Sequence, residues 1–282
     1  MSQALYHAST AKPFGGSQQR RVHSRRCVAS VVASVSSPGE STAPVAQLPL
    51  SAVAQVKQCA SAVSAALGDG IVLQRVELEL PLIGATDLDD WPGGTRQQLV
   101  AAVPLVSQLL TELAGSSIPV ARTNLDDSDG VALFTTSAHR VVTFVTADTL
   151  DQVKDLLQKD RGLCVFVNAA WKDSDFGWGP FVQRELKDFA GSLQETYSLR
   201  KMRIRGQQLR VVRAYPSAFT VYAMGLDGGK ADEIMCTSPT RPTYADLELA
   251  INKLGKRSIA NSDLLTRANA ELDFNKRSAN DF

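Results

Sequence analysis

One short stretch, "DLDDWPGGTRQQ" at residues 87–98, gathers acidic, aromatic, glycine and basic residues within a dozen positions. Two chemical interpretations are open. Backbone amides at a helix start near Thr95 would suit a phosphate, with Arg96 assisting, but the nearby aspartates would repel that anion, and neither GxGxxG nor GxxxxGK[ST] occurs. Asp87, Asp89 and Asp90 offer oxygen ligands for a hard cation, but the EF-hand spacing and its closing glutamate are missing.

A structural interpretation explains the same stretch better. Carboxylates just ahead of a helix favour its positive end, and Thr95 with Gln98 has the spacing of a capping box. We therefore interpret the stretch as a strand-to-helix joint that can also serve as a partner-facing loop. Its candidate interaction residues are Asp89, Asp90, Trp91 and Arg96.

Two further segments are candidates for an interaction surface. Trp171, Phe176 and Trp178 lie in "NAAWKDSDFGWGPF", between a buried strand and a helix. They either form an aromatic recognition surface or cap the sheet. The segment "RIRGQQLRVVR" includes Arg203 and Arg205, followed by two more arginines. It is either the solvated face of a hairpin or a site for an acidic partner or anionic lipid head groups.

The sequence provides no catalytic, cofactor-binding or metal-binding assignment. His139 is the only histidine after residue 23, and no GxSxG motif accompanies it. Cys59, Cys164 and Cys236 are far apart without CxxC pairs, which favours small buried hydrophobic side chains over zinc or disulfides. Acidic side chains can act as acid and base without histidine, so an enzyme is unsupported but stays open.

The hydrophobic periodicity predicts an α/β fold. Helical spacing is seen over residues 52–67, after Thr95, after Thr149, from Pro180 and after Thr243. Strands are predicted at 71–81, in "GVALFTT", "HRVVTFVT" and "GLCVFVNAAW", and in three closely spaced segments from "QLRVVRAYP" to "ADEIMCT". We expect a single-domain sandwich whose mixed, partly parallel sheet is flanked by helices and followed by a C-terminal antiparallel meander.

The N-terminal composition predicts a transit peptide for import into a plastid or a mitochondrion, and the family resemblance described below implies the plastid. Residues 1–39 contain five basic residues and no Asp or Glu. We expect a transit peptide at 1–33, a linker at 34–45, the α/β domain at 46–255 and a polar tail at 256–282. Removing the five basic residues leaves 25 (30 − 5) against 29 acidic residues, which disfavours a nucleic-acid binder. No apolar run is long enough to span a membrane.

Several segments carry a family resemblance: "DDWPGG", "VFVNAAW", "ETYSLRKMRI" and above all "LRVVRAYPSAFTVYAM". Over residues 46–255 the chain resembles the plastid and cyanobacterial domain-of-unknown-function family found in the Low PSII Accumulation Three protein. The resemblance implies a non-enzymatic protein of the stroma or the stromal face of the thylakoid. It would assist photosystem assembly, chiefly of photosystem II, through contacts with photosystem subunits or assembly factors.

The family resemblance implies no catalytic residue and no cofactor, and it allows peripheral association with the thylakoid. A similar domain is joined to some plastid adenylate kinases. This keeps an alternative open, in which the chain is a ligand-binding domain or enzyme acting on a small phosphorylated or nucleotide-like molecule.

Overall fold

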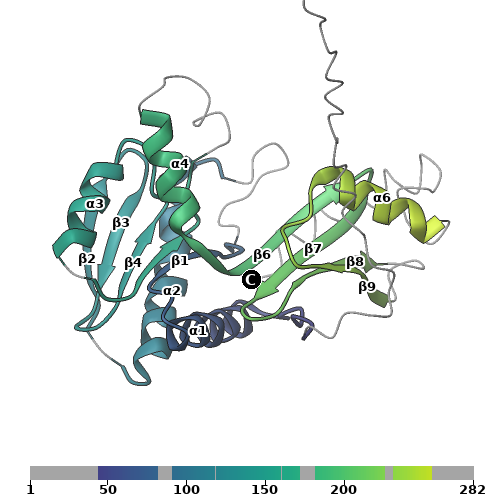
Figure 1. Ribbon diagram of the computed structural model, residues 1–282, viewed down its shortest axis with the longest axis horizontal. Coiled ribbons are helices and arrows are strands. Elements are labelled where there is room, and N and C mark those ends of the chain that lie inside the picture. The colour runs from purple at the N-terminus through teal and green to yellow at the C-terminus, as the bar shows by residue number, and fades with distance from the viewer. Residues whose placement is uncertain are drawn as a thin grey trace, which may run out of the picture. The chain divides into compact units, whose positions relative to one another are not determined.

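A mixed sheet of nine strands organises the described part of the chain (Figure 1). The computed structural model describes residues 44–81, 91–117, 119–159, 161–171, 182–225 and 231–255. The strand order is β2-β3-β4-β5-β1-β6-β7-β8-β9. The strands are β1 (Leu73–Glu77), β2 (Ala121–Asp126), β3 (Val131–Thr135), β4 (Arg140–Thr143), β5 (Cys164–Val167), β6 (Gln194–Ile204), β7 (Gln207–Ala214), β8 (Phe219–Gly225) and β9 (Ala231–Ser238).

The parallel strands lie at the centre of this sheet. β4 pairs with β5, β5 with β1, and β1 with β6, all in parallel. β2 and β3 extend the sheet antiparallel on one side, and β7, β8 and β9 form an antiparallel meander on the other. Every residue of β4 and β5 is buried, as expected for parallel strands covered on both faces.

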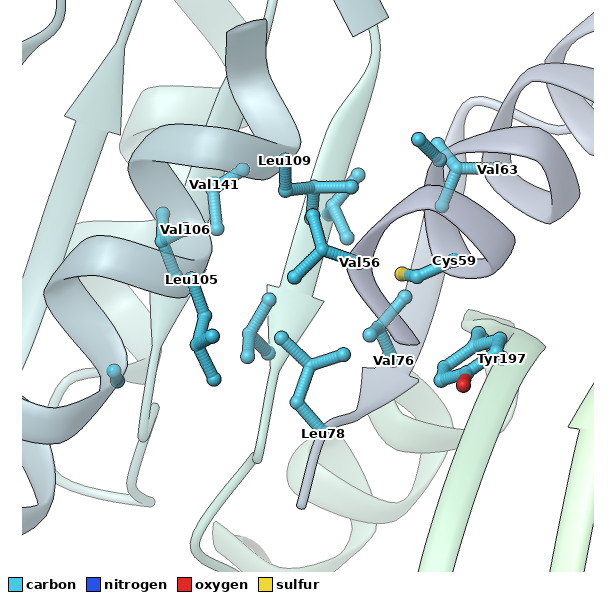
Figure 2. Close-up of a cluster of buried hydrophobic side chains, with 14 of the residues drawn as sticks. Val56, Cys59, Val63, Val76, Leu78, Leu105, Val106, Leu109, Val141 and Tyr197 are labelled. Carbon is cyan, nitrogen blue, oxygen red and sulfur yellow. The ribbon is translucent and has the colours of Figure 1, made fainter. Parts of the chain in front are cut away.

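Two helices cover one face of the sheet. They are α1 (Ala52–Gly68) and α2 (Gly94–Ala114). Figure 2 shows Val56 and Cys59 of α1 and Leu109 of α2 among the side chains gathered around Val76 and Tyr197 of the sheet. All five of these side chains are fully buried, so the spacing of apolar residues in both helices is satisfied by one shared core.

The opposite face carries two separate apolar clusters. The helices α3 (Leu150–Lys159) and α4 (Val182–Ser192) contribute to a cluster with β3, β4 and β5. The helix α6 (Tyr244–Leu254) packs with β6, β7 and β8 in the second cluster. Between the two clusters lies the part of this face formed by β1 and the first half of β6, which carries charged residues instead.

The sequence-based fold class is confirmed: the sheet is mixed and partly parallel, helices flank it, and the meander follows. The helix predicted after Thr243 is α6, which begins with a capping box formed by Thr243 and Asp246 and is followed by Gly255. Two strands were missed. β2 is mostly exposed and polar, so it lacks the alternation that marks a strand, and β6 attracted attention only through the family resemblance.

Candidate functional site

The candidate site begins where β1 and β5 end side by side. Neighbouring parallel strands whose connections leave on opposite faces form the crevice in which α/β proteins commonly bind ligands. Here the chain after β1 leads to α2 on one face, and the chain after β5 leads to α4 on the other. Asn168, the residue after β5, has a φ of 50° and joins its side-chain amide to both backbone groups of Leu78.

Charged side chains occupy the part of the sheet beside this edge, between the two apolar clusters of the same face. Glu77 of β1 pairs with Ser198 of β6, and Ser198 pairs with Arg213 of β7, so the three residues form one row across three strands. In the adjacent row, Arg75 of β1 lies opposite Glu195 of β6. We call Arg75, Glu77, Glu195, Arg200, Arg213 and Arg241 the arginine cluster.

Arg241 ties the cluster together from a distant part of the chain. It lies between β9 and α6, and its Nη2 donates to Glu77 Oε2 at 2.8 Å and to Glu195 Oε1 at 2.5 Å. Arg75 Nη2 donates to the other Glu77 oxygen at 2.9 Å. Both carboxylates therefore have arginine partners, and all four side chains are less than one third exposed.

Two more arginines add positive charge and form no ion pair with any described residue. Arg213 lies over the Phe219 ring, with its guanidinium carbon 4.8 Å from the ring centroid. Arg200 acts on Glu77 through its charge but makes no ion pair in the described part of the chain. Four arginines thus surround two carboxylates, which leaves a net charge of +2.

The pKa values within the cluster follow from burial and these charges. Burial alone would raise the pKa of Glu77, but Arg241, Arg75 and Arg200 outweigh it, so that the pKa is lowered. Burial lowers the pKa of Arg213, Glu195 opposes this effect, and the Arg241 charge adds to it. Burial would also lower the pKa of Arg241, but Glu77 and Glu195 raise it. At Arg213, the nearby carboxylate of Glu195 therefore does not offset the effect of burial.

The cluster also has unused hydrogen-bond donors. The Nε atoms of Arg75 and Arg213 are buried and have no acceptor among the described residues. An unsatisfied buried donor costs roughly 1–3 kcal/mol. Arginines and ionised carboxylates keep their charges near neutral pH, so this arrangement is suited to recognising a charged group and poorly suited to moving protons.

The structure corrects the capping predicted for the joint at Trp91. The helix α2 begins at Gly94, one residue before Thr95, and has no side-chain cap. Thr95 instead donates its hydroxyl proton to the Ser128 carbonyl, and Gly93 N–H donates to Gln97 Oε1. The capping box was wrong because the positive φ of Gly94 already turns the chain into the helix.

The predicted interaction residues of this joint have different environments. Trp91 is half-buried, and Arg96 is exposed while its Nε donates to the Asp127 carbonyl between β2 and β3. Asp89 and Asp90 lie outside the described residues. Phe176 and Trp178 do so as well.

Trp171 belongs to the core, which corrects its assignment to an interaction surface. Its side chain is 9% exposed and contacts the Phe189 ring edge-on, with centroids 6.0 Å apart. Phe189 in turn packs edge-on against Phe166 of β5. Of the two interpretations of the aromatic segment, capping the sheet is therefore the one that applies to Trp171.

The arginines of "RIRGQQLRVVR" do not form one patch. Arg205, in the turn between β6 and β7, pairs with Glu248 of α6 at 2.5 Å. Arg203 is exposed near that turn, while Arg210 lies 3.5 Å from Glu79. Only Arg213 belongs to the arginine cluster. Alternation along paired strands sends these side chains to different faces.

Other chemistry-bearing residues lie apart from the cluster. His139 is in the turn between β3 and β4, at the opposite end of the parallel strands from Asn168. Cys59 and Cys164 are buried, as predicted, while Cys236 is partly exposed. Across the described ranges, no group of three or more His, Cys, Asp or Glu residues could hold a metal ion. None of the described helices is long and apolar enough to cross a membrane.

The sequence prediction missed Arg75, Glu77, Glu195, Arg200 and Arg241. A signal existed in β1, where "RVE" places charges on alternate positions of a strand that is central and buried. Charges on such a strand require partners. No local pattern marks Arg241, because its partner Glu77 lies 164 residues earlier in the sequence.

Comparison with known proteins identifies a family whose function is unknown. No curated protein and no solved structure matches the chain. Residues 49–249 match the family described as "Domain of unknown function (DUF1995)", and this range includes every member of the arginine cluster. Because the match covers most of the 282 residues, the chain belongs to the DUF1995 family.

Proposed function

We propose that this chain is a non-enzymatic plastid protein that assists photosystem assembly, chiefly of photosystem II, through contacts with photosystem subunits or assembly factors. It acts in the stroma or at the stromal face of the thylakoid. The support is the acid-free N-terminal segment and the resemblance of "ETYSLRKMRI" and "LRVVRAYPSAFTVYAM" to the family found in the Low PSII Accumulation Three protein. These two segments include most of β6, β7 and β8.

The observation that carries this proposal is the chemical character of the arginine cluster. Arg241, Arg75 and Arg200 together outweigh burial and lower the pKa of Glu77, so this carboxylate stays ionised near neutral pH, and guanidinium groups keep their charge in proteins. Such groups recognise charge on a partner and do not supply the general acid or base that most enzymes need. A binding role fits this site better than a catalytic one.

The test is affinity capture of the tagged full chain from detergent-solubilised plastids, with quantitative mass spectrometry. We expect photosystem subunits or assembly factors to be enriched over a control bait. The double variant Arg200→Gln, Arg213→Gln should lose them. Arg205→Gln removes a positive charge at the Glu248 pair instead and should retain them. A bait that enriches no photosystem component would overturn the proposal.

Localisation is tested separately with a fluorescent fusion. The full chain should accumulate in chloroplasts, and a fusion that begins at residue 34 should remain outside them. Chloroplast import without residues 1–33, or secretion of the full chain, would contradict the proposed transit peptide.

The same guanidinium groups favour one alternative function, the binding of a small phosphorylated or nucleotide-like molecule. Titration of the full chain with ATP, ADP and AMP distinguishes this alternative from the assembly role. Saturable nucleotide binding together with failure to capture any photosystem component would favour the alternative over the assembly role.

A further inference from the structure

The arginine cluster has more positive charge than its own carboxylates neutralise. Arg75 and Arg241 pair with Glu77 and Glu195, which accounts for both negative charges. Arg200 and Arg213 remain without a carboxylate within ion-pair distance in the described part of the chain. Arg213 is half-buried, so water screens its charge less than it would on an open surface.

The pairing of the strands fixes where this excess charge lies. Arg213 is directly opposite Ser198, and Ser198 donates its hydroxyl proton to Glu77 Oε2 at 3.1 Å. Arg200 follows Ser198 by two positions on β6 and therefore projects from the same face. The two unpaired guanidinium groups thus border a row whose other polar groups are already positioned by hydrogen bonds.

An aromatic ring keeps the guanidinium group of Arg213 in place. The guanidinium of Arg213 stacks over Phe219, a fully buried side chain of β8, and Arg241 lies 5.9 Å from the same ring. Stacking on an aromatic ring orients a guanidinium without using its N–H donors. Arg213 therefore keeps its outer N–H donors for another acceptor, whereas its Nε is buried and has no acceptor among the described residues.

We infer that the arginine cluster is a binding site for an oxyanion, a carboxylate or phosphate group, held chiefly by Arg213 and Arg200. Planar guanidinium groups bind both kinds of oxyanion through paired N–H donors. Glu77 and Glu195 position Arg75 and Arg241 through their ion pairs. This inference goes beyond the proposed function, because the site would bind the anion whichever molecule carries it.

The test is calorimetric titration of the full chain at low ionic strength with two probes, inorganic phosphate and an acetylated glutamate-rich peptide. A lysine-rich peptide of equal length is the negative control. We expect saturable binding of at least one anionic probe at a single site. Saturation by phosphate alone or by the peptide alone identifies the source of the oxyanion, and either result supports the site.

Matched variants connect the binding to the cluster. Arg213→Gln should weaken the binding about tenfold or more, the effect of losing one charge-assisted hydrogen bond. Arg205→Gln makes the same change of charge at the hairpin turn and should alter the affinity less than about twofold. Equal weakening by both variants would mean general electrostatic attraction and would overturn the inference. Absence of saturable binding would overturn it as well.

The variant Arg200→Gln tests the site even if Arg213→Gln fails to fold. Arg200 is exposed, so Arg200→Gln should leave the melting temperature unchanged while weakening the binding severalfold. Unchanged affinity in a folded Arg200→Gln protein would remove Arg200 from the site. Anion binding without capture of photosystem components would keep this site and contradict the assembly role. Capture of photosystem components without anion binding would support the assembly role and contradict the anion site.

Discussion

Asn168 and Leu78 are joined by two hydrogen bonds across 90 residues of sequence. Leu78 N–H donates to Asn168 Oδ1 at 2.7 Å, and Asn168 Nδ2 donates to the Leu78 carbonyl at 3.0 Å. The Asn168 amide side chain thereby takes the place of a backbone partner just beyond the end of the β1–β5 ladder. The pair holds the ends of β1 and β5 together at the edge of the sheet where the following segments lead to helices on opposite faces.

Substitution of Asn168 tests this role. Asn168→Ala should lower the free energy of unfolding by roughly 2–4 kcal/mol, because two backbone groups of Leu78 lose their partner and alanine tolerates a positive φ poorly. Asn168→Gly also removes the amide but accepts the φ of 50°, so its cost should be about 1 kcal/mol smaller. Urea denaturation measures both values. Equal stability of all three proteins would show that the side chain contributes nothing.

Glu77 should make the stability of the fold depend on acid pH. Its folded pKa is lowered, so its ion pairs stabilise the fold fully above the unfolded pKa of about 4.3 and are lost as the pH falls through the folded pKa. Glu77→Gln should cost roughly 1–3 kcal/mol at pH 7, since it leaves the arginines less compensated. Below pH 4 the difference between the two proteins should shrink.

Denaturation measured between pH 7 and pH 3 checks this prediction. Glu185→Gln is the matched control, because Glu185 also pairs with a cation, Lys154 at 2.6 Å, but is exposed on α4. Solvent screens that pair, so the control should follow the wild-type pH profile closely. A Glu77→Gln protein whose deficit stays constant from pH 7 to pH 3 would exclude the ionised carboxylate as the cause.

The two threonines at helix starts should differ in their contribution to stability. Thr243 accepts from Asp246 N–H at 3.3 Å within a capping box, so Thr243→Ala should lower the free energy of unfolding by about 0.5–2 kcal/mol. Thr95 caps nothing and donates from an exposed position, so Thr95→Ala should cost about 0.5 kcal/mol or less. Thermal unfolding of the two variants measures both losses of stability. A larger loss from Thr95→Ala than from Thr243→Ala would support the capping box that the sequence predicted for α2.

Trp171 should behave as a core residue. Trp171→Ala should destabilise the protein by roughly 3–5 kcal/mol, because the indole is 9% exposed and packs on Phe189. Tyr244, another aromatic residue, is 57% exposed, and Tyr244→Ala should change the stability by about 0.5 kcal/mol or less. If calorimetry finds similar melting temperatures for the two variants, Trp171 is a surface residue and the aromatic segment again becomes an interaction candidate.

The helices and strands that could be predicted from the sequence are those whose burial produces a local pattern of apolar residues. The apolar stripe of α1 and the continuous apolar run of β5 are local patterns, and each is present. β2 was missed because it is an exposed edge strand, and exposed strands need no apolar alternation.

The candidate site was largely hidden from the sequence because its contacts are long-range. Arg75 and Glu77 carry a weak local signal, but Glu195 and Arg241 reach them only through the strand order of the folded sheet. Arg213 was singled out as part of a basic segment whose members the structure separates. The spacing of residues along the chain does not show which side chains of different strands become neighbours on one face of the sheet.

The central position of β1 has a consequence for how the chain folds as it is synthesised. Its two neighbours, β5 and β6, begin at Cys164 and Gln194, so β1 cannot be paired until much later sequence has emerged. Contacts of such high sequence separation make folding slow. A fragment that ends before Gln194 would leave one edge of β1 open to pairing with other chains, and would aggregate instead of forming half a domain.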